Sequence, residues 1–186
     1  MPDPIRLTLP ATRDSLLALR AGDAVLLSGP VYAARDATHE RLVEELERTG
    51  ELPYGLSGQT LFYAGPTPSA AGRPVGAVGP TTAKRMDPYT PALLHAGIVA
   101  TIGKGPRSHA VRSACAENGA VYFAALGGAA ALLARQVTAA EPVAYPELGT
   151  EALVRMTLDE FPVFVAMDAC GGDLYAHAAA EWATGA

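Results

Sequence analysis

Short apolar runs alternate with amphipathic stretches along most of this chain, which is the pattern expected of strands alternating with helices. Strands are predicted at residues 5–9, 24–27, 61–64, 98–102 and 121–126. Helices are predicted at residues 13–20, 37–49, 90–97, 108–118 and 129–136. Most of the strand segments are apolar throughout, as in strands covered on both faces, and the alternation over 98–136 favours parallel pairing.

Residues at the predicted helix ends support this interpretation. Asp36 stands where an N-cap belongs, directly before the helix 37–49. Thr90 is likewise the predicted N-cap of the next helix, with Pro91 as its first residue and Gly97 just past its end. His95 lies on that apolar helix and is expected to be a core histidine rather than a catalyst.

Beyond Val137 the pattern changes. Residues 151–158 and 161–167 both have the pattern of strands, and only Asp159 and Glu160 separate them, which predicts an antiparallel hairpin. A glycine-rich turn follows, and a last strand is expected to begin just after it, at residues 173–175. A helix-flanked sheet joined to a hairpin predicts a single α/β domain with a mixed sheet, covering the whole chain 1–186.

Composition places the chain among ordinary folded proteins. Its 186 residues are 49% hydrophobic and 18% charged, which allows one core without disulfides or metals. No apolar run is long enough to cross a membrane and the N-terminus has no secretion pattern, so we expect a cytoplasmic protein without a membrane partner. Cys115 and Cys170 have no clustered partners and are expected to be buried or idle thiols. We therefore predict no metal ligand in this chain.

Charge is unevenly distributed along the sequence. The net charge is −5, from 14 Lys and Arg against 19 Asp and Glu. Residues 61–116 hold six basic residues and one acid, Asp87, giving +5, so the remainder has 8 basic and 18 acidic residues, giving −10. A basic middle in an acidic protein favours a small anionic ligand bound at one place. Nucleic acid fits poorly, because the overall sign is wrong and no basic run with aromatic residues occurs.

One stretch concentrates hydroxyls and cations between two proline turns: residues 79–89, Gly-Pro-Thr-Thr-Ala-Lys-Arg-Met-Asp-Pro-Tyr. A short helix beginning at Thr81 would present free backbone N–H groups beside threonine hydroxyls, with Arg85 one turn further along. Such N–H groups, hydroxyls and a guanidinium together form an anion site. The alternative is a capped surface turn, in which Thr81 or Thr82 is the N-cap and the cations are solvated.

Arg35 follows a predicted buried strand and precedes a predicted helix, the place where open α/β sheets bind ligands. The alternative is a surface ion pair with Asp36 or Glu40. His39 lies in the first turn of the same helix and is expected to be exposed, the alternative being a hydrogen-bond donor behind the site.

Lys104 lies between two glycines directly after the strand 98–102. This arrangement lets backbone and ammonium group approach a ligand together. The phosphate-binding pattern GxxxxGK[ST] is absent there, so nucleotide binding is not expected.

Four of these stretches occur in a distinctive order. They are Ala-Arg-Asp-Ala-Thr-His at 34–39, the run at 79–89, Ile-Gly-Lys-Gly at 102–105, and Asp-Ala-Cys-Gly-Gly-Asp-Leu-Tyr at 168–175. From about Ser28 to Tyr175, the chain resembles the C-terminal domain of class I, iron–sulfur-dependent fumarases. In two-subunit relatives such as L(+)-tartrate dehydratase, the same region is a separate β subunit. The run 79–89 is the most specific element, because it matches over many positions.

The resemblance implies a swivelling β/β/α domain that serves a hydro-lyase acting on a four-carbon 2-hydroxy dicarboxylate. It also implies a [4Fe–4S] cluster held by three cysteines of a partner α domain or subunit. This chain lacks those cysteines and would be active only within a hetero-oligomer, such as α2β2.

Carried over residue by residue, the resemblance implies a proton-transfer role for Thr81, which would lie beside the reacting carbon. Threonine is a weak base, so a carboxylate of the partner is expected to share that step. Binding of the substrate is carried over to Arg35, Thr82, Arg85 and Lys104. Supporting positions behind them are expected for Asp36, His39 and Asp87.

Two other functions fit the residues. One is a stand-alone dicarboxylate-binding module that has lost its catalytic partner, and the other is an unrelated phosphate-handling enzyme. Fumarate/malate, tartrate/oxaloacetate and mesaconate/citramalate are all compatible with the pattern, because they differ by a methyl or hydroxyl group. An obligate partner predicts an exposed apolar patch on the basic face of the isolated chain.

Overall fold

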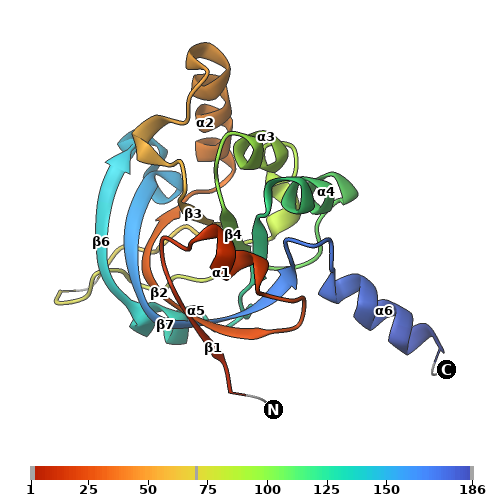
Figure 1. Ribbon diagram of the computed structural model, residues 1–186. Coiled ribbons are helices and arrows are strands. Elements are labelled where there is room, and N and C mark those ends of the chain that lie inside the picture. Colours follow the sequence, from red (N-terminus) through yellow and green to blue (C-terminus); the bar gives the residue numbers. More distant parts are fainter. Residues whose placement is uncertain (1–2, 70, 185–186) are drawn as a thin grey trace.

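A computed structural model describes residues 3–69 and 71–184 and shows one mixed sheet flanked by helices (Figure 1). The strands are β1 (Ile5–Thr8), β2 (Ala24–Ala33), β3 (Thr60–Phe62), β4 (Ala100–Gly103), β5 (Val121–Ala124), β6 (Val137–Ala144) and β7 (Leu153–Met167). β2, β3, β4 and β5 are parallel neighbours, and β7 pairs antiparallel with both β5 and β2. These five strands therefore close into a barrel, with β1 added beside β2 and β6 beside β7. The predicted α/β class with a mixed sheet is confirmed.

Helices fill most of the connections between strands. The α-helices are α1 (Arg13–Leu17), α2 (Asp36–Thr49), α3 (Thr90–His95), α4 (His109–Asn118), α5 (Ala130–Leu133) and α6 (Leu174–Thr184). Short 3₁₀ turns are η1 (Pro53–Gly55), η2 (Ala83–Met86), η3 (Ala134–Gln136) and η4 (Pro146–Glu151). Figure 1 shows α2, α3 and α4 grouped on one side of the barrel, whereas α6 extends away from it toward the C-terminus. The start of α4 is as predicted, because the Ser108 side chain accepts a hydrogen bond from the Val111 N–H.

Two packed clusters explain why the strands are apolar on both faces. Successive strand residues point to opposite faces, and in β3 Phe62 belongs to one cluster while Leu61 belongs to the other. The cluster of Leu61 also contains residues of α3 and α4, such as Leu93 and Val111, so it lies outside the barrel under those helices. Phe62 packs edge-on against Phe161 of β7, with ring centroids 5.4 Å apart, in the cluster on the opposite face.

The predicted hairpin at Asp159-Glu160 is wrong, because β7 is one strand of 15 residues. Its pairing with β2 shifts at this point, where Asp159 and Glu160 together lie opposite Ser28. Glu160 has a positive φ of 49°, and its N–H donates to Ser28 Oγ at 3.0 Å. This two-against-one pairing is a β-bulge, which bends a strand without ending it.

Other boundaries also differ from the sequence predictions. β2 is ten residues long and ends at Ala33, whereas the predicted strand ended at residue 27. β6 lies in a stretch with no predicted strand. The predicted last strand at 173–175 is the first turn of α6 instead. Asp173 Oδ1 accepts the N–H groups of Tyr175 and Ala176, so this residue caps a helix.

Candidate functional site

The sequence-predicted cations gather at one end of the barrel, where the four parallel strands finish. Arg35 follows β2, the run 79–89 follows β3, and Lys104 follows β4. Main-chain hydrogen bonds continue beyond the strands and hold these loops side by side. They run from Ala34 N to Phe62 O at 2.9 Å, from Tyr63 N to Ile102 O at 2.8 Å, and from Ala125 N to Gly103 O at 2.9 Å. This is the edge at which parallel α/β sheets place ligands.

Thr81 and Lys104 are tied together through their backbones. Lys104 N–H donates to the Thr81 carbonyl at 3.2 Å, and Ala83 N–H donates to the Lys104 carbonyl at 2.9 Å. The Thr81 hydroxyl and its backbone N–H both donate to the Tyr63 carbonyl, at 2.9 and 2.7 Å. Thr82 is exposed beside them. The Thr81 hydroxyl is thus fixed in orientation, with its oxygen still able to accept a hydrogen bond.

The predicted helix N-terminus at Thr81 is wrong. The helical turn is a 3₁₀ helix of four residues that begins at Ala83, and the N–H groups of Thr81 and Ala83 donate to carbonyls. These two N–H groups are therefore not free for an anion, and the attraction in this stretch comes from its side chains.

Arg35 and Arg85 each contact a carboxylate. Arg35 Nη2 lies 3.1 Å from Glu151 Oε1, and Arg85 forms an ion pair with Asp36. The partner of Arg35 is thus neither Asp36 nor Glu40, the two named in the alternative interpretation. The other oxygen of Glu151 accepts the Ala37 N–H at 3.1 Å. Glu151 was not among the predicted site residues, because the sequence indicated a strand at this position.

Two buried polar atoms beside these ion pairs lack a hydrogen-bond partner among the described residues. Arg35 Nε and Asp36 Oδ1 are buried and have no partner among the described residues. Asp36 is the first residue of α2 and Arg35 is its N-cap, so the predicted N-cap role of Asp36 is wrong. Such unsatisfied buried groups are rare unless water or a ligand completes them.

Lys104 is half-buried and has no ion pair in residues 3–69 and 71–184. Its side chain lies across Gly127, where an added Cβ would be 3.4 Å from Lys104 Cδ. The next residue, Gly105, is fixed from both sides, because its carbonyl accepts the Tyr122 hydroxyl at 2.8 Å and its N–H donates to the Tyr175 hydroxyl at 3.2 Å. Lys104 is therefore a positioned ammonium group available to a carboxylate.

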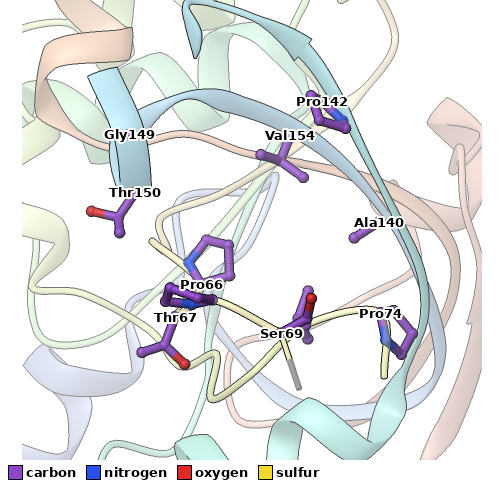
Figure 2. Close-up of a pocket in the computed structure, with 11 residues that line it drawn as sticks. Pro66, Thr67, Ser69, Pro74, Ala140, Pro142, Gly149, Thr150 and Val154 are labelled. Carbon is purple, nitrogen blue, oxygen red and sulfur yellow. The ribbon is translucent and has the colours of Figure 1, made fainter. Parts of the chain in front are cut away.

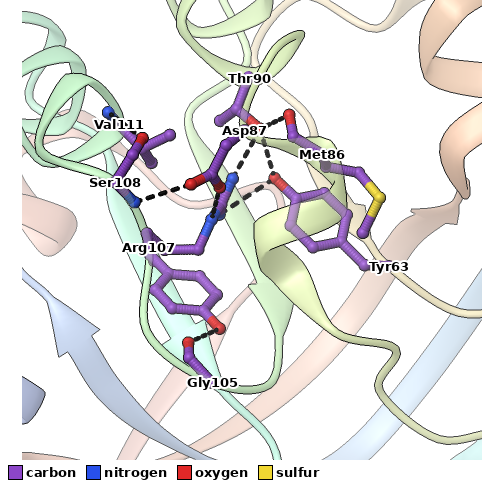
Figure 3. A network of polar contacts seen from close by, with 9 residues as sticks. Tyr63, Met86, Asp87, Thr90, Gly105, Arg107, Ser108 and Val111 are labelled. Atoms are coloured by element: carbon purple, nitrogen blue, oxygen red, sulfur yellow. Dashed lines mark hydrogen bonds and ion pairs between the residues drawn. The ribbon is translucent and has the colours of Figure 1, made fainter.

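Asp87 has a partner that was not predicted, the buried Arg107 (Figure 3). Arg107 Nε donates to Asp87 Oδ1 at 2.6 Å, and Asp87 Oδ2 accepts the Ser108 N–H at 2.7 Å. The other arginine nitrogens donate to the Thr90 hydroxyl at 2.7 Å and the Tyr63 hydroxyl at 3.3 Å. Burial alone would lower the pKa of Arg107, but the oxygens of Tyr63 and Asp87 outweigh it and raise that pKa, so the residue stays charged.

His39 is fully buried, so the expectation that it is exposed is wrong. Its Nδ1 lies 2.7 Å from the Arg35 carbonyl, which can only accept, so Nδ1 carries the proton. The ring also meets the edge of Tyr63 at a centroid distance of 5.1 Å. His95 likewise differs from its prediction, because it is exposed and lies 3.2 Å from Glu117 instead of in the core.

Burial lowers the pKa of His39 from 6.5 to about 4, so the folded protein holds this side chain neutral. Between pH 6.5 and pH 4, His39 is protonated in the unfolded chain but neutral in the folded protein. Its contribution to the free energy of unfolding is therefore complete above pH 6.5 and is lost as pH falls to about 4. The loss at pH 4 should be about 3 kcal/mol. We expect His39→Asn, which can still donate to the Arg35 carbonyl, to remove this part of the pH dependence. Urea unfolding of both proteins at pH 7 and pH 4 measures how much the free energy of unfolding changes between the two pH values. A variant that loses as much stability between pH 7 and pH 4 as the unchanged protein would refute the assignment.

The cations do not line a hollow of about 370 Å³ that lies between the segment after β3 and strands β6 and β7 (Figure 2). Its lining, which includes Pro66, Pro142 and Val154, contains no charged residue. A larger groove of about 540 Å³ has Ile5, Leu126 and Phe164 exposed along it. The part of its lining that the structure describes includes Asp3 and Asp23 but no Lys or Arg, so the apolar patch expected on the basic face stays a prediction.

Residues 3–69 and 71–184 contain no group of three or more His, Cys, Asp or Glu side chains able to hold an ion. Cys115 is buried in α4 and burial raises its pKa to about 12, whereas Cys170 is exposed in the turn before α6.

No helix in residues 3–69 and 71–184 has the length and apolar character required to span a bilayer.

Comparison with known proteins identifies related sequences. The family model described as Fumarase C-terminus matches residues 2–178. The chain is 41% identical over 151 residues to the anaerobic class I fumarate hydratase of Escherichia coli K12, covering 80% of this chain and 28% of that protein. It is 38% identical over 168 residues to fumarate hydratase 2 of Leishmania major, covering 88% and 29%.

A shorter relative is matched along nearly its whole length. It is a Methanocaldococcus jannaschii protein provisionally named L(+)-tartrate dehydratase subunit beta, 34% identical over 170 residues, covering 88% of this chain and 87% of that one. The chain thus spans less than a third of the fumarate hydratases above but most of this one.

Proposed function

Because the chain belongs to the fumarase C-terminus family, we propose that it is the β subunit of a heteromeric hydro-lyase. The proposed reaction is reversible addition of water to a four-carbon unsaturated dicarboxylate, of the fumarate hydratase or tartrate dehydratase type. The Methanocaldococcus protein, 34% identical and named as subunit beta of L(+)-tartrate dehydratase, supports the subunit assignment.

The observation that carries the proposal is the meeting of three cation-bearing loops at the C-terminal ends of β2, β3 and β4. A dicarboxylate needs a separate partner at each end, and two guanidinium groups and one ammonium group meet that need. Lys104 has no partner among the described residues, and Arg35 and Arg85 each use one nitrogen in their ion pairs. Substrate carboxylates would thus bind beside Asp36 and Glu151 without displacing them.

Thr81 is proposed to lie beside the carbon that loses or gains a proton. Its hydroxyl is held by the Tyr63 carbonyl, so the oxygen has a defined direction for its remaining lone pair. A threonine hydroxyl is a weak base, and a carboxylate from the partner would share the transfer. The three cations would stabilise the extra negative charge that develops when a proton next to a carboxylate is removed.

A [4Fe–4S] cluster is part of the proposal, but the residues of this chain do not fit it. One cysteine is buried with a raised pKa, the other is exposed, and the described residues provide no three-ligand group. The partner α subunit would therefore bring the cluster with three cysteines of its own. This chain would supply the substrate-binding loops.

Anaerobic reconstitution tests the proposal. This chain alone should contain no iron. It should not hydrate fumarate or mesaconate, and it should not remove water from tartrate. Together with an α subunit that carries three cluster cysteines, it should form a brown complex that does so, while the α subunit alone stays inactive. An inactive complex with full iron content would refute the hydro-lyase role. Tight dicarboxylate binding by the isolated chain in calorimetry would favour the stand-alone binding module.

A further inference from the structure

We infer that Arg107 is a positioning residue for the substrate loops. From its buried place it fixes the positions of Thr81, Arg85 and Lys104 relative to one another. Its side chain is fully buried between two tyrosine rings, with the guanidinium carbon 5.1 Å from the centroid of Tyr63 and 4.9 Å from that of Tyr122. It therefore acts on the site through other residues.

The guanidinium group of Arg107 joins segments that come from different strands. Arg107 itself lies three residues after Lys104, in the loop that follows β4. Its Nε reaches Asp87, two residues after Arg85, and the Ser108 N–H reaches the other oxygen of the same carboxylate. The loop of Lys104 and the loop of Arg85 are thus locked together by one carboxylate.

The second connection runs through Tyr63 to Thr81. Arg107 Nη1 donates to the Tyr63 hydroxyl at 3.3 Å, and the carbonyl of the same tyrosine accepts both hydrogen bonds from Thr81. The Tyr63 ring also packs against His39, whose Nδ1 donates to the Arg35 carbonyl. Thr81 is thereby two contacts away from Arg107, and Arg35 is three contacts away.

A third connection fixes the end of the run 79–89. Arg107 Nη2 donates to the Thr90 hydroxyl at 2.7 Å, and that hydroxyl donates to the Met86 carbonyl at 2.8 Å. Met86 is the last residue of η2, directly after Arg85. Figure 3 shows the guanidinium between Asp87, Thr90 and Tyr63.

Stability alone does not explain a charge in this place. A buried ion pair costs desolvation energy comparable to its attraction, and apolar residues of similar volume often replace one without loss of stability. A guanidinium does what an apolar side chain cannot, because its planar donors fix several partners in defined directions. Since the loops it joins carry the proposed substrate groups, the inference rests on the proposed function for its catalytic meaning.

Amide hydrogen exchange in this chain tests the positioning directly and requires no partner. The first variant, Arg107→Lys, keeps the positive charge but loses the planar set of donors. The second is the double variant Tyr63→Phe, Thr90→Val, which keeps Arg107 and removes only the two hydroxyl groups to which it donates. We expect exchange at Thr81, Ala83 and Lys104 N–H groups to rise about tenfold or more in both proteins. The control is Leu16→Ala, a buried residue of α1 that takes no part in the contacts of Arg107 described above, which should lower overall stability without this selective change. Unchanged exchange at these three N–H groups, relative to that control, would overturn the inference.

A double-mutant cycle in the reconstituted enzyme supplies the catalytic readout. Arg107→Lys should lower kcat/KM about tenfold, and its effect should be clearly smaller in the Thr81→Ala background, because the part that acts through Thr81 is already lost while the part that acts through Arg85 and Lys104 remains. Independent, additive losses would show a merely structural role. Faster exchange in a complex that has full iron but no hydro-lyase activity would leave the positioning intact and refute the proposed function instead.

Discussion

Replacing Arg85 with alanine is expected to lower kcat/KM of the reconstituted enzyme about 100-fold, mainly through a higher KM. A hydrogen-bonded pair between charged groups contributes about 1.5–3 kcal/mol, and the change also leaves Asp36 without its partner. The unpaired Asp36 carboxylate would then repel an anionic substrate next to Arg35. Steady-state kinetics with fumarate or the preferred dicarboxylate measures the effect.

Two matched variants make this prediction specific. Arg85→Ala combined with Asp36→Asn should recover part of the lost affinity, because the repulsive charge is removed with the attractive one. Lys84→Ala removes the neighbouring exposed cation, for which no ion pair occurs in the described residues, and should change kcat/KM less than twofold, in line with other surface substitutions. Equal losses for Lys84→Ala and Arg85→Ala would mean that only net charge matters, and the site assignment would fail.

Replacing Thr81 with alanine is expected to lower kcat by about 10²- to 10⁴-fold, the range for loss of a positioned proton-transfer group. KM should change little, because the cations that bind the carboxylates remain. Thr81→Ser keeps the hydroxyl that donates to the Tyr63 carbonyl and should keep most of the activity. Pre-steady-state and steady-state rates of both variants, with thermal unfolding as a check on folding, measure the difference.

The Thr81 prediction can fail in two distinct ways. If alanine raises KM but leaves kcat intact, Thr81 is a binding residue only. If serine is as inactive as alanine while both remain folded, the methyl group rather than the hydroxyl is what the site requires.

Local patterns predicted the buried strands well because both faces of the sheet are covered. Their limits appear at β7, where the pair Asp159-Glu160 looks like a turn but forms a bulge against Ser28. The strand continues because both halves pair with the same long β2, and this pairing is a long-range contact. A two-residue turn and a two-residue bulge have the same local sequence pattern.

The candidate site shows the same division. Arg35, Arg85 and Lys104 stood out because each follows a strand or lies within a proline-bounded run. Arg107 and Glu151 did not stand out, since their importance comes from partners that are distant in sequence: Asp87 for the first and Arg35 for the second. Burial of a charged residue such as Arg107 cannot be inferred from its neighbours along the chain.

His39 illustrates the remaining difficulty. A histidine in the first turn of an amphipathic helix is usually exposed, but α2 begins against the loop that carries Tyr63, and that contact buries the ring. Only the placement of β3 beside β2 brings the two together.

The most direct test of the central claim is a crystal structure of this chain in complex with its cluster-bearing partner and an unreactive four-carbon dicarboxylate. The account predicts one carboxylate within hydrogen-bond distance of Arg85 or Arg35, the other within reach of Lys104, and the Thr81 hydroxyl beside the central carbons. A ligand bound in the apolar cavity of Figure 2, with all three cations facing solvent, would contradict it.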